Sequence, residues 1–210
     1  MHRYTKTAKA REDNPFIGPL TTRPIIVVAG ALWPIGSGED YEIPLGTPMC
    51  PVSTTGKYRP IRRSYVVTAL ASSDTQIYLN SVKGFATGDV LAMFTGAAST
   101  THSITATVTG VDYTNNIITV AALAVAATNI VTNAYVEVQH NGYLLNRADA
   151  VFLGENIQTG STADGETWDV PAMGIIKGQV DVNRLDTNCY DALIETQISG
   201  MDYIPLTSGV

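Results

Sequence analysis

Charged residues are scarce in this sequence. Only 15% of its 210 residues are Asp, Glu, Lys or Arg, against about 25% in an average soluble domain. Threonine is abundant instead, with 26 residues, and threonine is favoured in strands and disfavoured in helices. The composition therefore argues against a coiled coil or a helical bundle and favours a mainly β protein.

Long apolar runs are lacking as well. The longest, at residues 121–127, is far shorter than the roughly 18 residues that a transmembrane helix requires. The basic residues near the N-terminus are followed by no apolar stretch, so the sequence predicts no secretory signal. We expect no association with a membrane and synthesis in the cytoplasm.

Histidine and cysteine are few, with three and two residues. Cys50 and Cys189 lie far apart and fit no metal or redox spacing, and no two histidines are at metal-ligand spacing. Motifs for a serine nucleophile or a phosphate loop are lacking too. We therefore expect no enzyme activity, no catalytic residue, no metal ion and no cofactor.

One acidic cluster leaves alternatives open. Asp164, Glu166 and Asp169 lie close together around a glycine, and we interpret them as a solvated loop. A calcium site and carboxylate-catalysed hydrolysis of a polysaccharide are the less favoured alternatives. Trp33 and Trp168 are the residues that a carbohydrate-binding surface would use, although two tryptophans are also ordinary for a protein core.

Proline and charge divide the chain into zones. Eight of the ten prolines lie within residues 1–60, and none lies within residues 61–170. Residues 1–63 carry nine of the thirteen Lys and Arg and five acids, whereas the remainder carries four bases and fourteen acids. The first 24 residues are rich in basic residues and proline and predict an extended arm. Such an arm is either a disordered, solvated tail or a segment that becomes ordered on an acidic partner surface.

The proline-free middle zone has the clearest strand pattern. Short alternating segments recur about every ten residues, and Asp112 to Asn116 is typical of a hairpin turn. This pattern predicts a small β-barrel or sandwich. The predicted strands span residues 65–68, 76–79, 88–94, 103–111, 117–120 and 134–138.

The flanking zones predict further strands and one helix. Residues 25–29 form a β-branched run typical of a buried strand, and the prolines within residues 45–52 indicate an edge strand. Residues 170–180 are also strand-like. A helix is expected from Asn188 to a stop at Gly200, because apolar residues recur there at helical spacing.

A basic group follows the early strands and is the best candidate for a contact surface, and it consists of Lys57, Arg59, Arg62 and Arg63. With a net charge of −6 and few aromatic residues beside these bases, we expect no nucleic-acid binding. Together with the arm, the candidate contact residues are Arg3, Lys6, Lys9, Arg11, Lys57, Tyr58, Arg59, Arg62 and Arg63.

Two stretches resemble a known family. Leu45-Gly46-Thr47-Pro48-Met49 and Ser53-Thr54-Thr55-Gly56-Lys57-Tyr58-Arg59-Pro60 resemble the G-T-V-L … T-G-K-Y-x-P stretch of tailed-phage head decoration (capsid cement) proteins of the lambda D-like type. Ala172 to Leu185, with the sequence AMGIIKGQVDVNRL, resembles the closing G-x-V-N-x-x-x-L strand and short helix of that family.

The resemblance implies a compact decoration-protein β fold, β-tulip-like with one short C-terminal helix, built from residues 25–63 and 141–210. Residues 64–140 depart from the family pattern, so we expect them to form an inserted small β-barrel or sandwich. The implied function is that of a structural virion protein on the capsid exterior, which bridges major capsid protein subunits and stabilises the shell. It also implies a homo-oligomer, with a trimer favoured. The alternative is a head-fibre or tail adhesin, or a carbohydrate-binding β module.

Overall fold

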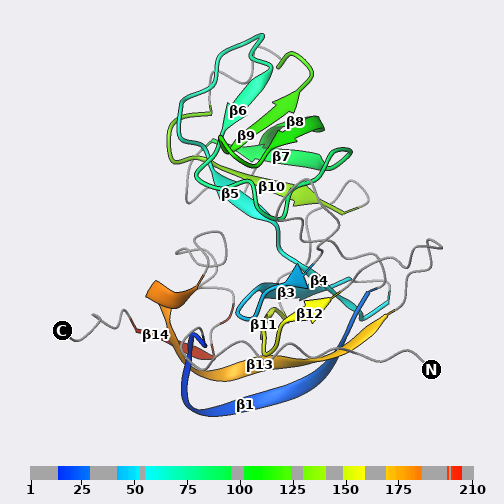
Figure 1. The fold of residues 1–210 in the computed structure, drawn as a ribbon, viewed down its shortest axis with the longest axis vertical. Helices are drawn as coiled ribbons and strands as arrows, with labels where there is room; N and C mark the ends of the chain where they lie inside the picture. Colours follow the sequence, from blue (N-terminus) through cyan, green and yellow to red (C-terminus); the bar gives the residue numbers. More distant parts are fainter. Residues whose placement is uncertain are drawn as a thin grey trace. The chain divides into compact units, whose positions relative to one another are not determined.

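The computed structural model describes residues 14–28, 42–52, 55–95, 102–123, 130–140, 149–158, 169–185, 198 and 200–204. The chain is mainly β and forms two compact units (Figure 1). Of the described residues, 14–28, 42–60 and 149–204 belong to the first unit, and 61–140 belong to the second. Residues 61–63, which we had placed with the flanking domain, therefore lie in the second unit.

The first unit contains a six-stranded sheet in the order β1-β4-β3-β11-β13-β14. β1 also pairs with β13, so the sheet returns on itself. A separate pair is formed by β2 and β12. The elements are β1 (Phe16–Val27), β2 (Glu42–Ile43), β3 (Pro48–Pro51), β4 (Tyr58–Pro60), β11 (Val151–Leu153), β12 (Ile157–Gln158), β13 (Val170–Asp181), the short 3-10 helix η3 (Val182–Arg184) and β14 (Met201–Ile204).

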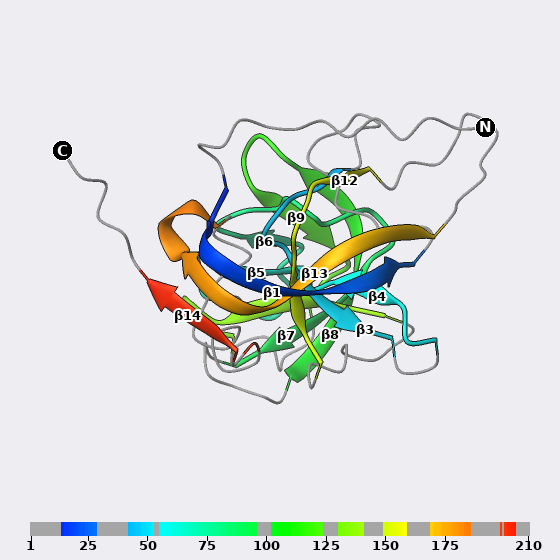
Figure 2. The same cartoon turned by 90° about the horizontal axis from the view of Figure 1, so that it is seen from below.

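β1 and β13 form a long antiparallel pair that runs from Phe16 opposite Val180 to Val27 opposite Val170 (Figure 2). A bulge interrupts the register near Thr21. Residues 16–24, which we had assigned to the extended arm, thus belong to this strand. That part of the expectation is wrong, because β13 supplies these residues with backbone partners that are not visible in the local sequence.

β3 was expected at an edge of its sheet, and it lies between β4 and β11. Its prolines, Pro48 and Pro51, occupy the first and last positions of the strand. Met49 and Cys50 between them keep their N–H groups for the sheet, so the prolines do not break it. The expected helix from Asn188 to Gly200 lies almost wholly outside the described residues, and η3 is the single helix within them.

The second unit is a curled six-stranded sheet in the order β5-β10-β7-β8-β9-β6, with every neighbouring pair antiparallel. Its end strands meet where Val66 bridges Leu79. All six strands expected in this zone are present, with ends shifted by a few residues. They are β5 (Arg63–Tyr65), β6 (Gln76–Tyr78), β7 (Val90–Phe94), β8 (His102–Asp112), β9 (Ile117–Val120) and β10 (Tyr135–Gln139).

Alternation along these strands produces the core of the second unit. Every second residue points inward, and the buried cluster includes Val66, Leu91, Met93, Val136 and Val138. The expected hairpin turn joins β8 to β9. There the Asp112 carboxylate accepts hydrogen bonds from the side chain and N–H of Asn115 and from the Thr114 N–H, and these lower its pKa. Asn116 has a φ of +55°.

The core of the first unit includes a close contact between distant segments. A Cβ added at Gly46 would lie 2.7 Å from Leu185 Cδ2 and 3.2 Å from Pro15 Cγ. The φ of Gly46 is +83°, which other residues adopt only with strain. Its N–H donates to the Leu153 carbonyl at 2.8 Å, so the turn before β3 is fixed against β11.

This contact yields a stability prediction. Replacing Gly46 with Ala should lower the free energy of unfolding by about 2–4 kcal/mol, because left-handed backbone strain and overpacking against Leu185 both contribute. The control is Gly56→Ala, where φ is +65° and no atom lies within 4 Å of the added Cβ. Urea unfolding should show a smaller loss for the control, and equal losses would contradict the packing argument.

Candidate functional site

The described residues of the predicted basic contact group are divided between the two units. Arg3, Lys6, Lys9 and Arg11 lie outside the described residues. Lys57, Tyr58 and Arg59 belong to the first unit, whereas Arg62 and Arg63 belong to the second.

Tyr58 is buried in the first unit instead of forming part of a contact surface. Its hydroxyl accepts a hydrogen bond from the Arg23 guanidinium, which also donates to the Asp149 carbonyl at 2.9 Å. Burial raises the pKa of the Tyr58 hydroxyl above its usual value near 10, and the positive charge of Arg23 partly offsets this rise. Arg23, which we had placed in the arm, therefore helps to fix β1 to β4.

Lys57 and Arg59 remain accessible to different degrees. Lys57 Nζ contacts Asp169 Oδ2 at 2.5 Å, and the two side chains are 36% and 35% exposed. Arg59 is partly buried, and its neighbours in β4, Tyr58 and Pro60, are buried. Of Lys57, Tyr58 and Arg59, Lys57 is the most accessible to a partner. Its ion pair with Asp169 is weakened by the surrounding water, so the pair does not prevent another contact.

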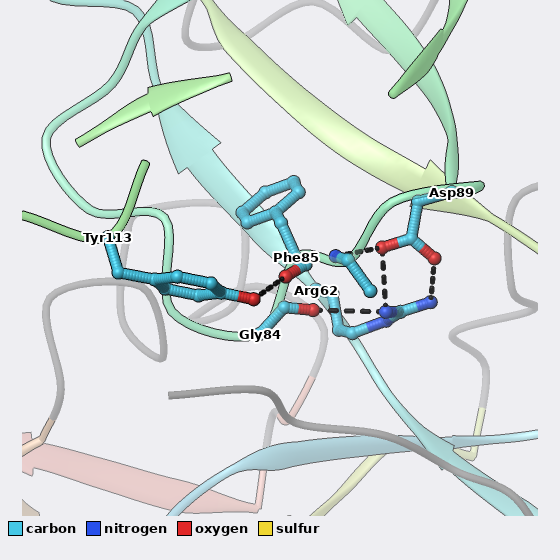
Figure 3. A network of polar contacts seen from close by, with 6 residues as sticks. Arg62, Gly84, Phe85, Asp89 and Tyr113 are labelled. Atoms are coloured by element: carbon cyan, nitrogen blue, oxygen red, sulfur yellow. Dashed lines mark hydrogen bonds and ion pairs between the residues drawn. The ribbon is translucent and has the colours of Figure 1, made fainter. Parts of the chain in front are cut away.

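Arg62 is committed to a network inside the second unit (Figure 3). Its guanidinium donates to both carboxylate oxygens of Asp89, at 2.9 and 2.8 Å, and to the Gly84 carbonyl at 3.0 Å. Asp89 Oδ2 also accepts from the Ala86 N–H at 2.7 Å. Close to these contacts, the Tyr113 hydroxyl donates to the Phe85 carbonyl at 2.6 Å. Arg62 therefore holds the loop before β7 in place.

Arg63 is almost fully buried, so it does not present its charge to a partner in this structure. It pairs in register with Glu137 of β10, which is equally buried. Its guanidinium lies 5.3 Å from the centre of the Tyr135 ring, which stacks on Phe94 with centroids 4.0 Å apart. Arg63 thus belongs to a buried aromatic and charged layer on the face of the sheet opposite the apolar core.

The other candidate groups are only partly described. Asp164, Glu166, Trp33, Trp168, Cys189 and His2 lie outside the described residues. Cys50 is buried, His102 is exposed and His140 is partly buried. Within the described ranges, no three His, Cys, Asp or Glu side chains are grouped as metal ligands require. No helix among those residues is long and apolar enough to cross a membrane.

A depression of about 330 Å³ lies over β8 in the second unit. Its described lining is mostly aliphatic, with hydroxyl groups from Thr105 and Thr107. Ligand sites usually combine an apolar wall with several convergent polar groups, so this lining gives little indication of a specific ligand.

Sequence reasoning missed the exposed apolar side chains. Six large apolar residues are exposed among the described residues, namely Leu20, Ile26, Val67, Tyr78, Val131 and Met173. The run at residues 25–29 is typical of a buried strand, whereas in β1 Ile25 and Val27 are buried and Ile26 is exposed.

Comparison with known proteins gives no relative: no family model, no curated protein and no solved structure matches this chain.

The ion pairs Arg62–Asp89 and Lys57–Asp169 differ in burial, so we expect them to contribute differently to the free energy of unfolding. Arg62→Met should lower the free energy of unfolding by about 2–3 kcal/mol, because the bidentate pair with Asp89 is only 15% and 12% exposed. Lys57→Met removes the more exposed pair with Asp169 and should lower the free energy of unfolding by less than about 1 kcal/mol. Urea denaturation followed by circular dichroism tests this order, and the reverse order would refute it.

Burial of the Tyr58 hydroxyl predicts a loss of stability at alkaline pH. A pKa raised in the folded state means that the unfolded chain releases this proton first, so unfolding becomes more favourable as pH rises above about 10. Tyr58→Phe should therefore show a shallower fall in stability between about pH 9.5 and 11. Identical slopes for both proteins would rule out Tyr58 as the titrating group.

Proposed function

We propose that this chain is a structural virion protein that binds the outer surface of an assembled phage capsid and bridges major capsid protein subunits. The observation that carries the proposal is the close approach of Gly46 to Leu185, where an added Cβ would lie 2.7 Å from Leu185 Cδ2. Gly46 belongs to the first stretch that resembles capsid decoration proteins, and Leu185 ends the second. The residues that resemble the family thus pack against one another although they are distant in sequence.

The sheet of the first unit supports the same proposal. β3 and β4 come from the first resembling stretch and β13 comes from the second, and β11 connects β3 with β13. This arrangement favours a single body composed of the resembling segments.

Tyr58 and Arg63 are buried and Arg62 is bound to Asp89 and Gly84, which reduces the contact surface proposed from sequence. The remaining candidates are Lys57, Arg59 and the four basic residues of the arm. The arm directly precedes β1, whose first residues pair with the end of β13. A protein that binds only the assembled shell stabilises that shell by mass action, without any chemical reaction.

A carbohydrate-binding module or adhesin is the second candidate. The observation that favours it is the exposed Tyr78 ring on the second unit, whose hydroxyl lies 3.1 Å from Gln76 Oε1. An aromatic ring beside an amide can stack on a sugar and hydrogen-bond its hydroxyl groups. Glycan binding that is lost in Tyr78→Ala, together with a failure to bind capsids, would favour this candidate.

Capsid binding tests the first candidate. Purified protein should co-sediment with expanded capsids assembled without it, in a fixed ratio to the major capsid protein. Deleting residues 1–13 should weaken this binding several-fold and leave the thermal midpoint of the free protein nearly unchanged, because the deletion spares Pro15, whose carbonyl accepts from the Asp181 N–H.

The matched control keeps the arm and removes its charge by replacing Arg3, Lys6, Lys9 and Arg11 with Gln. If the arm meets acidic capsid residues, this variant should bind as weakly as the deletion, and raised salt should weaken the native protein. Native protein that does not sediment with capsids at any salt concentration would overturn the proposal.

A further inference from the structure

β8 lies between β7 and β9 in the second unit (Figure 1), and β9 borders only one part of it. β7 pairs with β8 within residues 102–107, whereas β9 pairs with it only within residues 108–112. Among the described residues, none pairs with residues 104–107 on the side of β8 that faces away from β7. In the described part of the chain, this stretch of β8 is therefore an open sheet edge.

The open edge borders the depression of about 330 Å³, which is called here the β8 slot. Its lining includes all four of residues 104–107, although successive residues of a strand point to opposite faces of the sheet. The β8 slot therefore runs along the edge of the strand, where the backbone can be reached. Ala121, Ala122 and Leu123, which directly follow β9, line it as well.

The backbone groups of Thr105 and Thr107 are directed into the β8 slot. The Val108 N–H donates to the Asp89 carbonyl at 2.8 Å, and the Val108 carbonyl accepts from the Gly88 N–H at 2.8 Å. Both groups of Val108 thus point towards the β7 side. Because this direction alternates along an antiparallel strand, the N–H and carbonyl groups of Thr105 and Thr107 point away from β7. Such groups at a sheet edge can pair with the backbone of an added strand.

The burial of side chains along β8 changes at the same place. Val108, where β9 pairs with β8, is 1% exposed. Ile104 and Ala106 pack against the same core but are only partly buried. An apolar side chain from a strand in the β8 slot would cover them, as the neighbouring strand β9 covers Val108.

Both sides of the β8 slot are fixed from outside. β7 holds one side through its pairing with β8. On the other side, the Leu123 N–H donates to the Asp74 carbonyl and the Leu123 carbonyl accepts from the Ser73 N–H, both at 2.9 Å. A second copy of the open edge is a poor occupant, because its own β7 would have to enter with β8. A single free segment fits between these two sides.

We propose that the β8 slot binds an extended, uncharged segment of a partner protein, which joins the sheet as a strand beside β8. The segment supplies the alternating N–H and carbonyl groups that the open edge can pair with, a mode known from other peptide-binding sheets. None of the described lining residues is charged, so a charged side chain buried there would find no counter-charge. The small apolar lining favours residues such as valine on the core side and threonine on the outer side.

The contact is short, so an isolated peptide should bind weakly. We expect a Kd of about 1 mM for a pentapeptide, because each hydrogen bond contributes little net free energy in water and the peptide loses conformational freedom. Within a complete partner, neighbouring contacts raise the effective concentration of the segment. The inference goes beyond capsid binding, since it concerns the second unit alone and its test uses no capsid.

Nuclear magnetic resonance of the full chain tests the proposal. In the free protein, the amide hydrogens of Thr105 and Thr107 should exchange about tenfold or more faster than that of Ala106, which points towards β7. Adding an acetylated and amidated pentapeptide of alternating threonine and valine should shift the Thr105 and Thr107 amide signals in a saturable way and slow their exchange. The matched control peptide has the same side chains and methylated backbone nitrogens, and it should leave both signals unchanged.

A pair of protein variants tests the location of the site. Ala121→Trp places a bulky ring in the β8 slot and should abolish the shifts. The control is Ala69→Trp, at an exposed alanine outside the described lining, and it should bind the peptide like the native chain. Circular dichroism establishes that both variants are folded, and the peptide pair tests the native chain without any variant.

Several results would overturn the proposal. Slow exchange of Thr105 and Thr107 in the free protein would mean that the chain fills the β8 slot by itself. Shifts of these signals on raising the protein concentration alone would assign the slot to a second copy. Equal shifts with both peptides, no shift with either, or unchanged binding by folded Ala121→Trp would each refute pairing of a strand with this edge.

Discussion

The first unit depends on the pairing of β1 with β13. β13 pairs with β1 along its whole length on one side and with β11 and β14 on the other, so segments from both ends of the chain share one sheet. Val27 opposite Val170 shows how distant these partners are in sequence. The entropic cost of closing such a loop grows only slowly with its length, so a long insertion between the partners is tolerated. The second unit occupies that insertion.

Arginine side chains hold neighbouring segments together in both units. Arg23 joins β1 to Tyr58, Arg62 fixes a loop through Asp89, and Arg63 lies buried beside Glu137. A guanidinium group carries several donors in a fixed plane, so it can satisfy carbonyl and carboxylate groups where a lysine would satisfy fewer. The consequence for function is that these three arginines are engaged within their units, whereas Lys83, Lys177 and Arg184 remain exposed.

The strands of the second unit could be predicted because their signals are local. Alternation with a period of two sets which residues are buried, and Asp112 with Asn116 sets the turn between β8 and β9. The extent of β1, the central position of β3 and the burial of Tyr58 and Arg63 could not be predicted in the same way. Each depends on a partner strand that lies far away in the sequence, and a single sequence does not show which strands pair.

The amino-acid sequence by itself determined that the chain is mainly β, where the strands of residues 61–140 lie, and that positive charge gathers in the first 63 residues. Only the tertiary structure decided which of those charges are buried and which apolar residues are exposed. The physical reason is that composition and alternation act between neighbours along the chain, whereas burial is set by what packs against each face. Ile26 and Arg63 show both outcomes, since the apolar side chain is half exposed and the charged one is enclosed.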